Sequence, residues 1–114
     1  MDAISSVLIA KALDGLSMRQ MFSAQNIANA NTPGYKAIEV TFEKSLKLAA
    51  GKGIESIENL RPKTQYAQTA SGSTEMRLDM ELAKASQTAM RYGALIDVLG
   101  RQMALARTVV SGGQ

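Results

Sequence analysis

The sequence predicts an all-α dominated fold, in which long N- and C-terminal helices pair as an antiparallel coiled coil. An irregular middle arm with a short extended segment joins them. Non-polar residues recur at alternating spacings of four and three over 78–110, which is the period of a coiled-coil seam. No proline occurs before Pro33. Aromatic residues make up only 4% of the chain, whereas compact cores usually depend on them for buried area.

The composition excludes several classes of function. The 114-residue chain contains no Cys and no His, which excludes thiol nucleophiles, disulfides, Cys/His zinc sites and imidazole acid–base chemistry. The net charge of +3 comes from basic residues that are interleaved with acids, so we expect no nucleic-acid partner. The run Val7–Ala10 is too short for a secretory signal, and no segment is long enough to span a membrane.

Residues 1–31 predict the first long helix, with Asp2 as its N-cap. Its apolar residues fall on two neighbouring arcs, one containing Leu16 and Ile27 and the other containing Ile4 and Phe22. A single partner helix would cover one arc only. We therefore expect helices from other subunits to cover the second.

A turn should follow this helix. Asn29 and Asn31 predict its end, since Asn is a poor interior residue and tolerates a left-handed terminal position. Thr32-Pro33-Gly34-Tyr35 then predicts a type II turn, with glycine where φ must be positive.

The middle segment, residues 32–78, should be irregular. Ile38, Val40 and Phe42 alternate with polar residues, which predicts a short extended arm. One or two helical turns over 44–50 and a short helix or docked loop over 54–60 should follow, and 67–74 is small and polar. With so few apolar residues, we expect this segment to order against neighbouring subunits.

Residues 79–114 predict the heptad helix, with Asp79 as N-cap and Thr74 as a competing start. The seam comprises Leu78, Leu82, Ala85, Ala89, Tyr92, Ile96, Leu99, Met103, Ala106 and Val110. Asp97 and Arg101 should form a favourable i, i+4 pair. Gly93 and Gly100 are interpreted as points where a neighbouring helix approaches closely.

Residues 23–36 read SAQNIANANTPGYK. This string resembles the N-terminal signature of the bacterial flagellar axial proteins, the rod and hook family, in which a helix ends in Asn-x-Ala-Asn before Thr-Pro-Gly-Tyr. The matching residues are Asn26, Ile27, Ala28, Asn29, Asn31, Thr32, Pro33, Gly34 and Tyr35. Residues 81–99 are similar to the C-terminal helix of proximal rod members. The short middle segment differs from hook and distal rod relatives, which carry an inserted domain.

The resemblance implies a structural subunit of the proximal rod of the flagellar basal body. Such a subunit is exported unfolded by the flagellar type III apparatus without a cleaved signal. In the periplasmic space it folds as it joins a helical tube that surrounds the export channel and transmits torque. The implied partners are copies of itself, other rod proteins, a junction protein of the FliE type and the MS ring. No enzyme activity and no cofactor are implied.

We expect the subunit interface to use a defined set of residues: Ile4, Leu8, Phe22, Asn26, Ile27, Asn29, Asn31, Thr32, Pro33, Gly34, Tyr35, Leu82, Tyr92, Ile96, Leu99 and Met103. Asn26 and Asn29 either form a polar contact at the subunit boundary or cap the helix. The alternatives are a sister proximal rod protein, another self-assembling or adaptor coiled coil of a type III secretion-like apparatus, and, least favoured, an enzyme. Asp79 and Glu81 diverge on a helix, and Ser71 and Ser73 have no base nearby in sequence.

Overall fold

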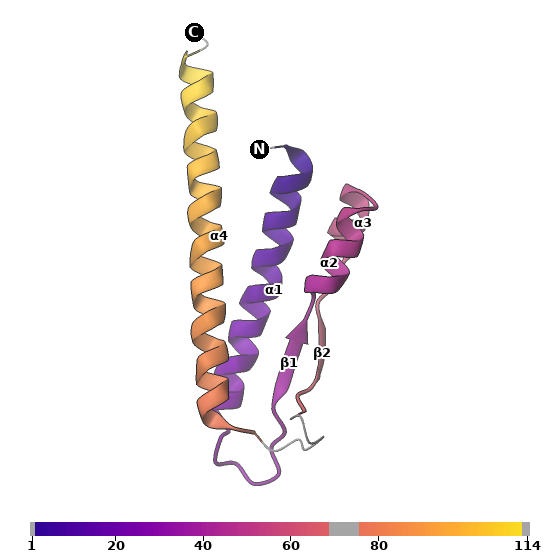
Figure 1. Ribbon diagram of the computed structural model, residues 1–114, viewed down its shortest axis with the longest axis vertical. Helices are drawn as coiled ribbons and strands as arrows, with labels where there is room; N and C mark the ends of the chain where they lie inside the picture. Colours follow the sequence, from indigo (N-terminus) through magenta and orange to yellow (C-terminus); the bar gives the residue numbers. More distant parts are fainter. Residues whose placement is uncertain (1, 69–75, 113–114) are drawn as a thin grey trace.

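The computed structural model describes residues 2–68 and 76–112. Two long antiparallel helices, α1 (Ala3–Ala28) and α4 (Leu78–Gly112), lie side by side (Figure 1). On the far side of α1 lie β1 (Ile38–Thr41), α2 (Glu43–Ala50), α3 (Ile54–Asn59) and β2 (Lys63–Tyr66). The molecule is an elongated body of 63 × 27 × 18 Å. Of the residues that the structure describes, 72% are helical, which confirms the predicted class.

Both ends of α1 agree with the sequence. The Ser5 backbone N–H donates to Asp2 Oδ1 at 2.8 Å, so Asp2 is the N-cap. The helix ends at Ala28 with Asn29 as C-cap, although its φ is −102°. Asn29 therefore ends the helix without the left-handed conformation that asparagine tolerates, and among the described residues only glycines have positive φ.

The predicted type II turn is confirmed. The Tyr35 N–H donates to the Thr32 carbonyl at 3.2 Å, and Gly34 has φ +78°. A residue with a Cβ is strained at that angle.

The two strands of the middle segment form a small antiparallel sheet. Ile38 pairs with Tyr66 and Thr41 with Lys63. The extended arm, the helical turns over α2 and the short helix α3 were predicted. Strand β2 was not, because its four residues are all exposed and show no apolar alternation.

β1 and the two short helices pack on α1 of their own chain, and β2 pairs with β1. They contribute most of the fully buried apolar side chains, among them Val40, Phe42 and Ile57. Leu16 of α1 joins Val40 and Phe42 in the central cluster. The segment therefore finds partners within its own chain, where the sequence led us to expect neighbouring subunits, and on the second arc of α1 Phe22 is half-buried while Ile4 stays exposed. A few apolar residues per element suffice, because α1 supports β1, α2 and α3, and β2 is held by its pairing to β1.

The contact between α1 and α4 is rotated from the predicted seam. Ala85, Tyr92 and Leu99 are half-buried, as expected, whereas Leu82 and Ile96 are exposed. The fully buried residues of α4 are the polar pair Glu81 and Thr88. The face of α4 that packs against α1 is therefore rotated about the helix axis by roughly 50°, or about one heptad position, from its most apolar stripe.

Two further features of α4 differ from those predicted from the sequence. The helix begins at Leu78, so Asp79 lies in its first turn and is not the cap. No atom of the described chain lies within 4 Å of a Cβ built at Gly93 or Gly100, so α1 makes no close approach there. The competing start at Thr74, the serines at 71 and 73, and most of the polar stretch 67–74 lie outside the described residues.

Candidate assembly surfaces and the buried polar network

A buried polar network joins α1, the type II turn, β1 and α4 at Asn26, which is 1% exposed. Its Nδ2 donates to the Ile38 carbonyl at 2.8 Å and to Glu81 Oε1 at 2.7 Å. Its Oδ1 accepts from the Tyr35 hydroxyl at 2.7 Å and the Ile38 N–H at 3.0 Å. Every hydrogen-bonding position of the amide is used. Burial, reinforced by the Glu81 charge, raises the pKa of Tyr35, so its hydroxyl remains a donor.

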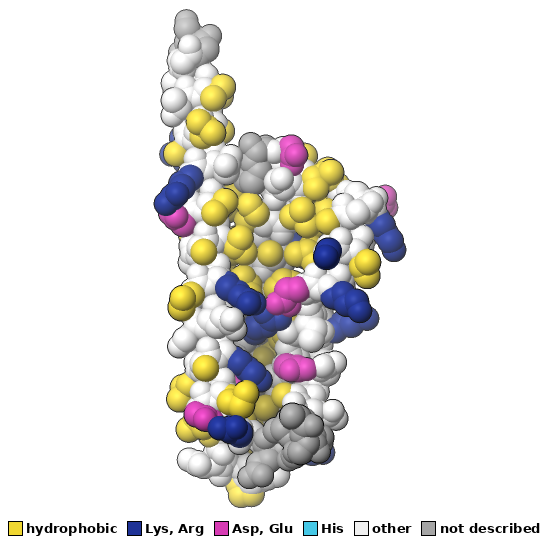
Figure 2. All heavy atoms as spheres, viewed as in Figure 1, with side chains coloured by type: hydrophobic (Ala, Val, Ile, Leu, Met, Phe, Trp, Pro, Cys, Tyr) yellow, Lys and Arg dark blue, Asp and Glu magenta, His cyan; other side chains and the backbone are white. Residues whose placement is uncertain are grey.

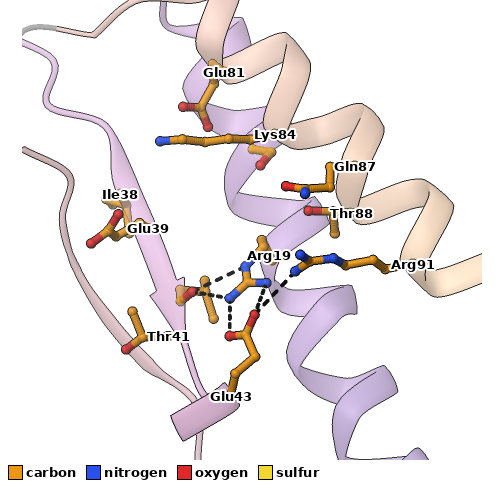
Figure 3. Close-up of a pocket in the computed structure, with 12 residues that line it drawn as sticks. Arg19, Ile38, Glu39, Thr41, Glu43, Glu81, Lys84, Gln87, Thr88 and Arg91 are labelled. Atoms are coloured by element: carbon orange, nitrogen blue, oxygen red, sulfur yellow. Dashed lines mark hydrogen bonds and ion pairs between the residues drawn. The ribbon is translucent and has the colours of Figure 1, made fainter. Parts of the chain in front are cut away.

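A second cluster forms around Arg19 (Figure 3). Its guanidinium donates to the Val40 carbonyl at 2.7 and 3.2 Å and to both carboxylate oxygens of Glu43 at 2.6 and 2.8 Å. It also lies over the Phe42 ring, 4.9 Å from the centroid. Arg91 of α4 reaches Glu43 at 3.6 Å. Hydrogen bonding to Arg19 lowers the pKa of Glu43, so this ion pair links α1, α2 and α4.

Together these two clusters cover one edge of the two-stranded sheet. β2 pairs with one edge of β1, and the polar groups of Ile38 and Val40 lie at the other edge. Asn26 pairs with the N–H and carbonyl of Ile38, and Arg19, two turns away on α1, donates to the carbonyl of Val40. An unpaired strand edge is a template for unwanted pairing, and here α1 blocks it with side chains.

The two asparagines make different contacts within the chain. Asn29 caps the helix locally, since its Nδ2 donates to the Gln25 carbonyl at 2.9 Å and its Oδ1 accepts from the Thr32 hydroxyl at 3.1 Å. Asn26 does neither of the predicted things, because it is the centre of the internal network. Tyr35 belongs to that network, while Asn31, Pro33 and Gly34 are exposed.

The remaining predicted interface residues divide into covered and exposed groups. Leu8, Phe22, Ile27, Tyr92 and Leu99 are half-buried within the chain. Those left exposed are Ile4, Leu82, Ile96 and Met103. The last three belong to one stripe with a seven-residue repeat, Leu82, Ala89, Ile96, Met103 and Val110, which we call the outer stripe of α4. No described element covers it.

Sequence reasoning missed Arg19, Glu43 and Glu81. A signal for two of them was present, since Arg19 lies seven residues before Asn26 and Glu81 lies seven before Thr88. Polar residues repeating at one heptad position mark a face that meets polar partners. Within the described ranges, no group of acidic side chains could hold a metal, and no helix is long and apolar enough to cross a bilayer.

The segment that builds both clusters also carries the likeness to known proteins. Residues 12–36 match the family model described as flagella basal body rod protein. The chain is 27% identical over 117 residues to the flagellar basal body rod protein FlgB of Bacillus subtilis (strain 168), covering 90% of each chain. It is 54% identical over 37 residues to FlgB of Borrelia hermsii, covering 32% of this chain and 27% of that relative.

The chain is thus similar to flagellar basal body rod proteins, most strongly around the end of α1 and more weakly over most of its length. Members of the rod protein family are structural components of the flagellar basal body, and the family is not known for catalysis. The match over 12–36 includes Arg19, Asn26, Asn29 and the turn that ends in Tyr35. The matched segment thus contains Asn26 and Tyr35, two side chains of the network that joins the end of α1, the turn and β1.

Proposed function

We propose that this chain is a structural subunit of the proximal rod, and that it completes its folding as it joins a helical assembly around the export channel. The outer stripe of α4 is the observation that carries the proposal. Its large members are between 45% and 68% exposed, and they repeat every seven residues over most of the helix. A stripe of that period is built to lie against another helix.

The small core supports folding on assembly. Within residues 2–68 and 76–112, the buried apolar side chains are only Leu16, Ala37, Val40, Phe42, Ala49 and Ile57. Ordering a residue costs about 1.5 kcal/mol of conformational entropy. A chain of 114 residues with so small a core has little with which to offset that cost. Contacts with other subunits would supply the missing stabilisation.

The partners we propose follow from the same surfaces. Copies of this chain and other rod proteins would cover the outer stripe of α4 and the exposed Ile4. A junction protein of the FliE type and the MS ring would meet one end of the assembly. Asn31, Pro33 and Gly34, exposed beside the network, would contact a neighbouring subunit. A marginally stable subunit also suits passage through the type III export apparatus into the periplasmic space in an unfolded state, without a cleaved signal.

Substitution on the outer stripe tests this function. Ile96→Asp places a charge at a position that is 45% exposed in the single subunit, so the fold of the chain should survive. In an assembly the same charge would be buried without a partner. We expect basal bodies to lack the variant and motility to fall at least tenfold.

Ser86→Asp is the matched control, because Ser86 is exposed on α4 outside the outer stripe. It should leave motility unchanged. Normal motility in cells whose only copy carries Ile96→Asp would contradict the proposed function.

A further inference from the structure

We propose that the C-terminal end of α4 in one subunit lies in an apolar groove between α1, α2 and α4 of the next. This inference rests on the proposed rod function and names the contact that propagates the assembly. It comes from two unpartnered apolar features, one a groove and the other a projecting helix end.

The groove opens between the two long helices and the short helix α2. It has a volume of about 570 Å³, and its walls are formed by Leu8, Ala12, Leu16, Leu46, Ala50 and Ala94, among others. Hydrophobic side chains gather in this hollow, and Lys, Arg, Asp and Glu side chains border it (Figure 2). Its floor is continuous with the α1–α4 contact, because Leu16 and Leu95 take part in both.

The helix end projects beyond its own partner. α4 has 35 residues and α1 has 26, and the C-terminal end of α4 extends past the start of α1 (Figure 1). Gln102 is the last half-buried residue, and every residue over 103–112 is exposed. Met103, Leu105, Val109 and Val110 are 53–68% exposed.

The helix end continues the side of α4 that faces α1. Leu95, Gln102 and Val109 share one heptad position, and Leu99 and Ala106 share the adjacent one. The face of α4 that contacts α1 therefore continues beyond Gln102, where it no longer meets α1. This continuity favours a second copy over an unrelated occupant, because the groove is lined by the same α1–α4 contact that the helix end extends.

The area of the contact favours an open assembly over a dimer. Ten helical residues measure about 15 Å, and half the surface of a helix about 10 Å wide covers roughly 250 Å² at that length. A standard interface buries about 800 Å² per partner. One such contact is too small to hold a dimer. Because groove and helix end are different surfaces, the contact is head-to-tail and can repeat from subunit to subunit.

Cysteine cross-linking tests the contact, because the natural chain has no cysteine. Ala94→Cys marks the groove at an exposed position, and Val109→Cys marks the helix end. The two single variants are expressed together in a flagellated bacterium that lacks its own copy, and isolated basal bodies are oxidised. We expect a disulfide-linked dimer that forms only when both variants are present. Ala83→Cys, exposed on α4 outside the groove, replaces Ala94→Cys in the control and should give no cross-link with Val109→Cys.

The outcomes separate this inference from the proposed function. Motile cells that incorporate both variants but form no cross-link between positions 94 and 109 would overturn the groove contact and leave the function standing. Cross-links of either single variant to itself would also overturn it, because they require a symmetric contact. Failure of every cysteine variant and of the unmodified chain to enter basal bodies would reject the function and the inference together.

A second pair of variants measures the same contact without oxidation. Ala94→Glu fills the groove with a charge at an exposed position, whereas Ala83→Glu leaves the groove open. We expect at least a tenfold loss of incorporation for the first and none for the second. Equal incorporation of the two would contradict the proposal.

Discussion

Asn26 shows how one side chain can organise several segments. It uses both donors and both acceptor positions on four partners from the turn, β1 and α4. An apolar residue at this position would leave the Ile38 backbone groups and the Glu81 carboxylate buried without partners. A buried polar group without a partner costs about 1–3 kcal/mol.

Asn26→Leu should therefore destabilise the folded chain by about 3 kcal/mol. The folded state can be populated with trimethylamine N-oxide, an osmolyte that favours burial, and followed by far-UV circular dichroism. We expect the osmolyte midpoint to rise well above that of the natural chain. Asn31→Leu, at an exposed position, should stay within about 0.5 kcal/mol. Equal midpoints for the two variants would contradict the role of the network.

The ion pair of Arg19 and Glu43 makes the stability of the folded chain depend on pH. The Arg19 hydrogen bonds lower the pKa of Glu43 from its ordinary value of 4.5. The folded chain thus holds this proton less tightly than the unfolded chain does. The resulting stabilisation is present above pH 4.5 and is lost as the pH falls through the lower pKa of the folded state.

Glu43→Gln should remove this part of the acid sensitivity. Asp2 and Asp79 also have lowered pKa values, so the informative quantity is the difference between the natural chain and the variant. We expect the variant to be less stable at pH 7, with the gap closing below about pH 4.5. Because the Glu43 side chain is half exposed, the gap should stay below about 1 kcal/mol. A gap that does not change with pH would reject the ion pair as its cause.

At the scale of elements, α1 is the support on which the other elements pack. α4 covers one side of it, and β1, α2 and α3 cover another. The sequence predicted both long helices, the Asp2 cap and the Pro33–Gly34 turn, because each of these depends on local rules. It did not predict β2, which is polar and exposed and is held in place by its backbone pairing to β1. Nor did it predict the buried faces of Glu81 and Thr88, because their partners lie far away in the chain.

Gly15 marks a close approach between α1 and the middle segment. A Cβ at this position would lie 2.6 Å from the Phe42 ring, and Phe42 is itself buried. Gly15→Ala should therefore destabilise the chain by about 1–3 kcal/mol through overpacking, despite the helix propensity of alanine. Gly93→Ala is the matched comparison, because nothing in the described chain lies near its Cβ.

We expect Gly93→Ala to stabilise the single chain by about 1 kcal/mol. The osmolyte midpoints of the two variants should therefore shift in opposite directions. A stabilising effect of Gly15→Ala would show that α1 and Phe42 do not pack as described.

At the scale of the whole molecule, the chain is long, thin and incompletely covered. The coiled-coil period in the sequence predicted that α4 would need helical partners, but it did not reveal how α1 and other subunits share that helix. In the structure α1 takes a face that includes Glu81 and Thr88, and the more apolar outer stripe of α4 stays open. The sequence pattern alone could not distinguish these faces, because adjacent heptad positions have the same period.

We infer that the chain becomes fully ordered only together with other subunits. The most direct test is far-UV circular dichroism of the purified chain over a range of concentrations, alone and mixed with other rod proteins. We predict that the dilute chain has a helix content well below the 72% of the folded structure, and that the content rises with concentration or with added partners. A dilute monomer with the full helix content and a cooperative melting transition independent of concentration would contradict the account.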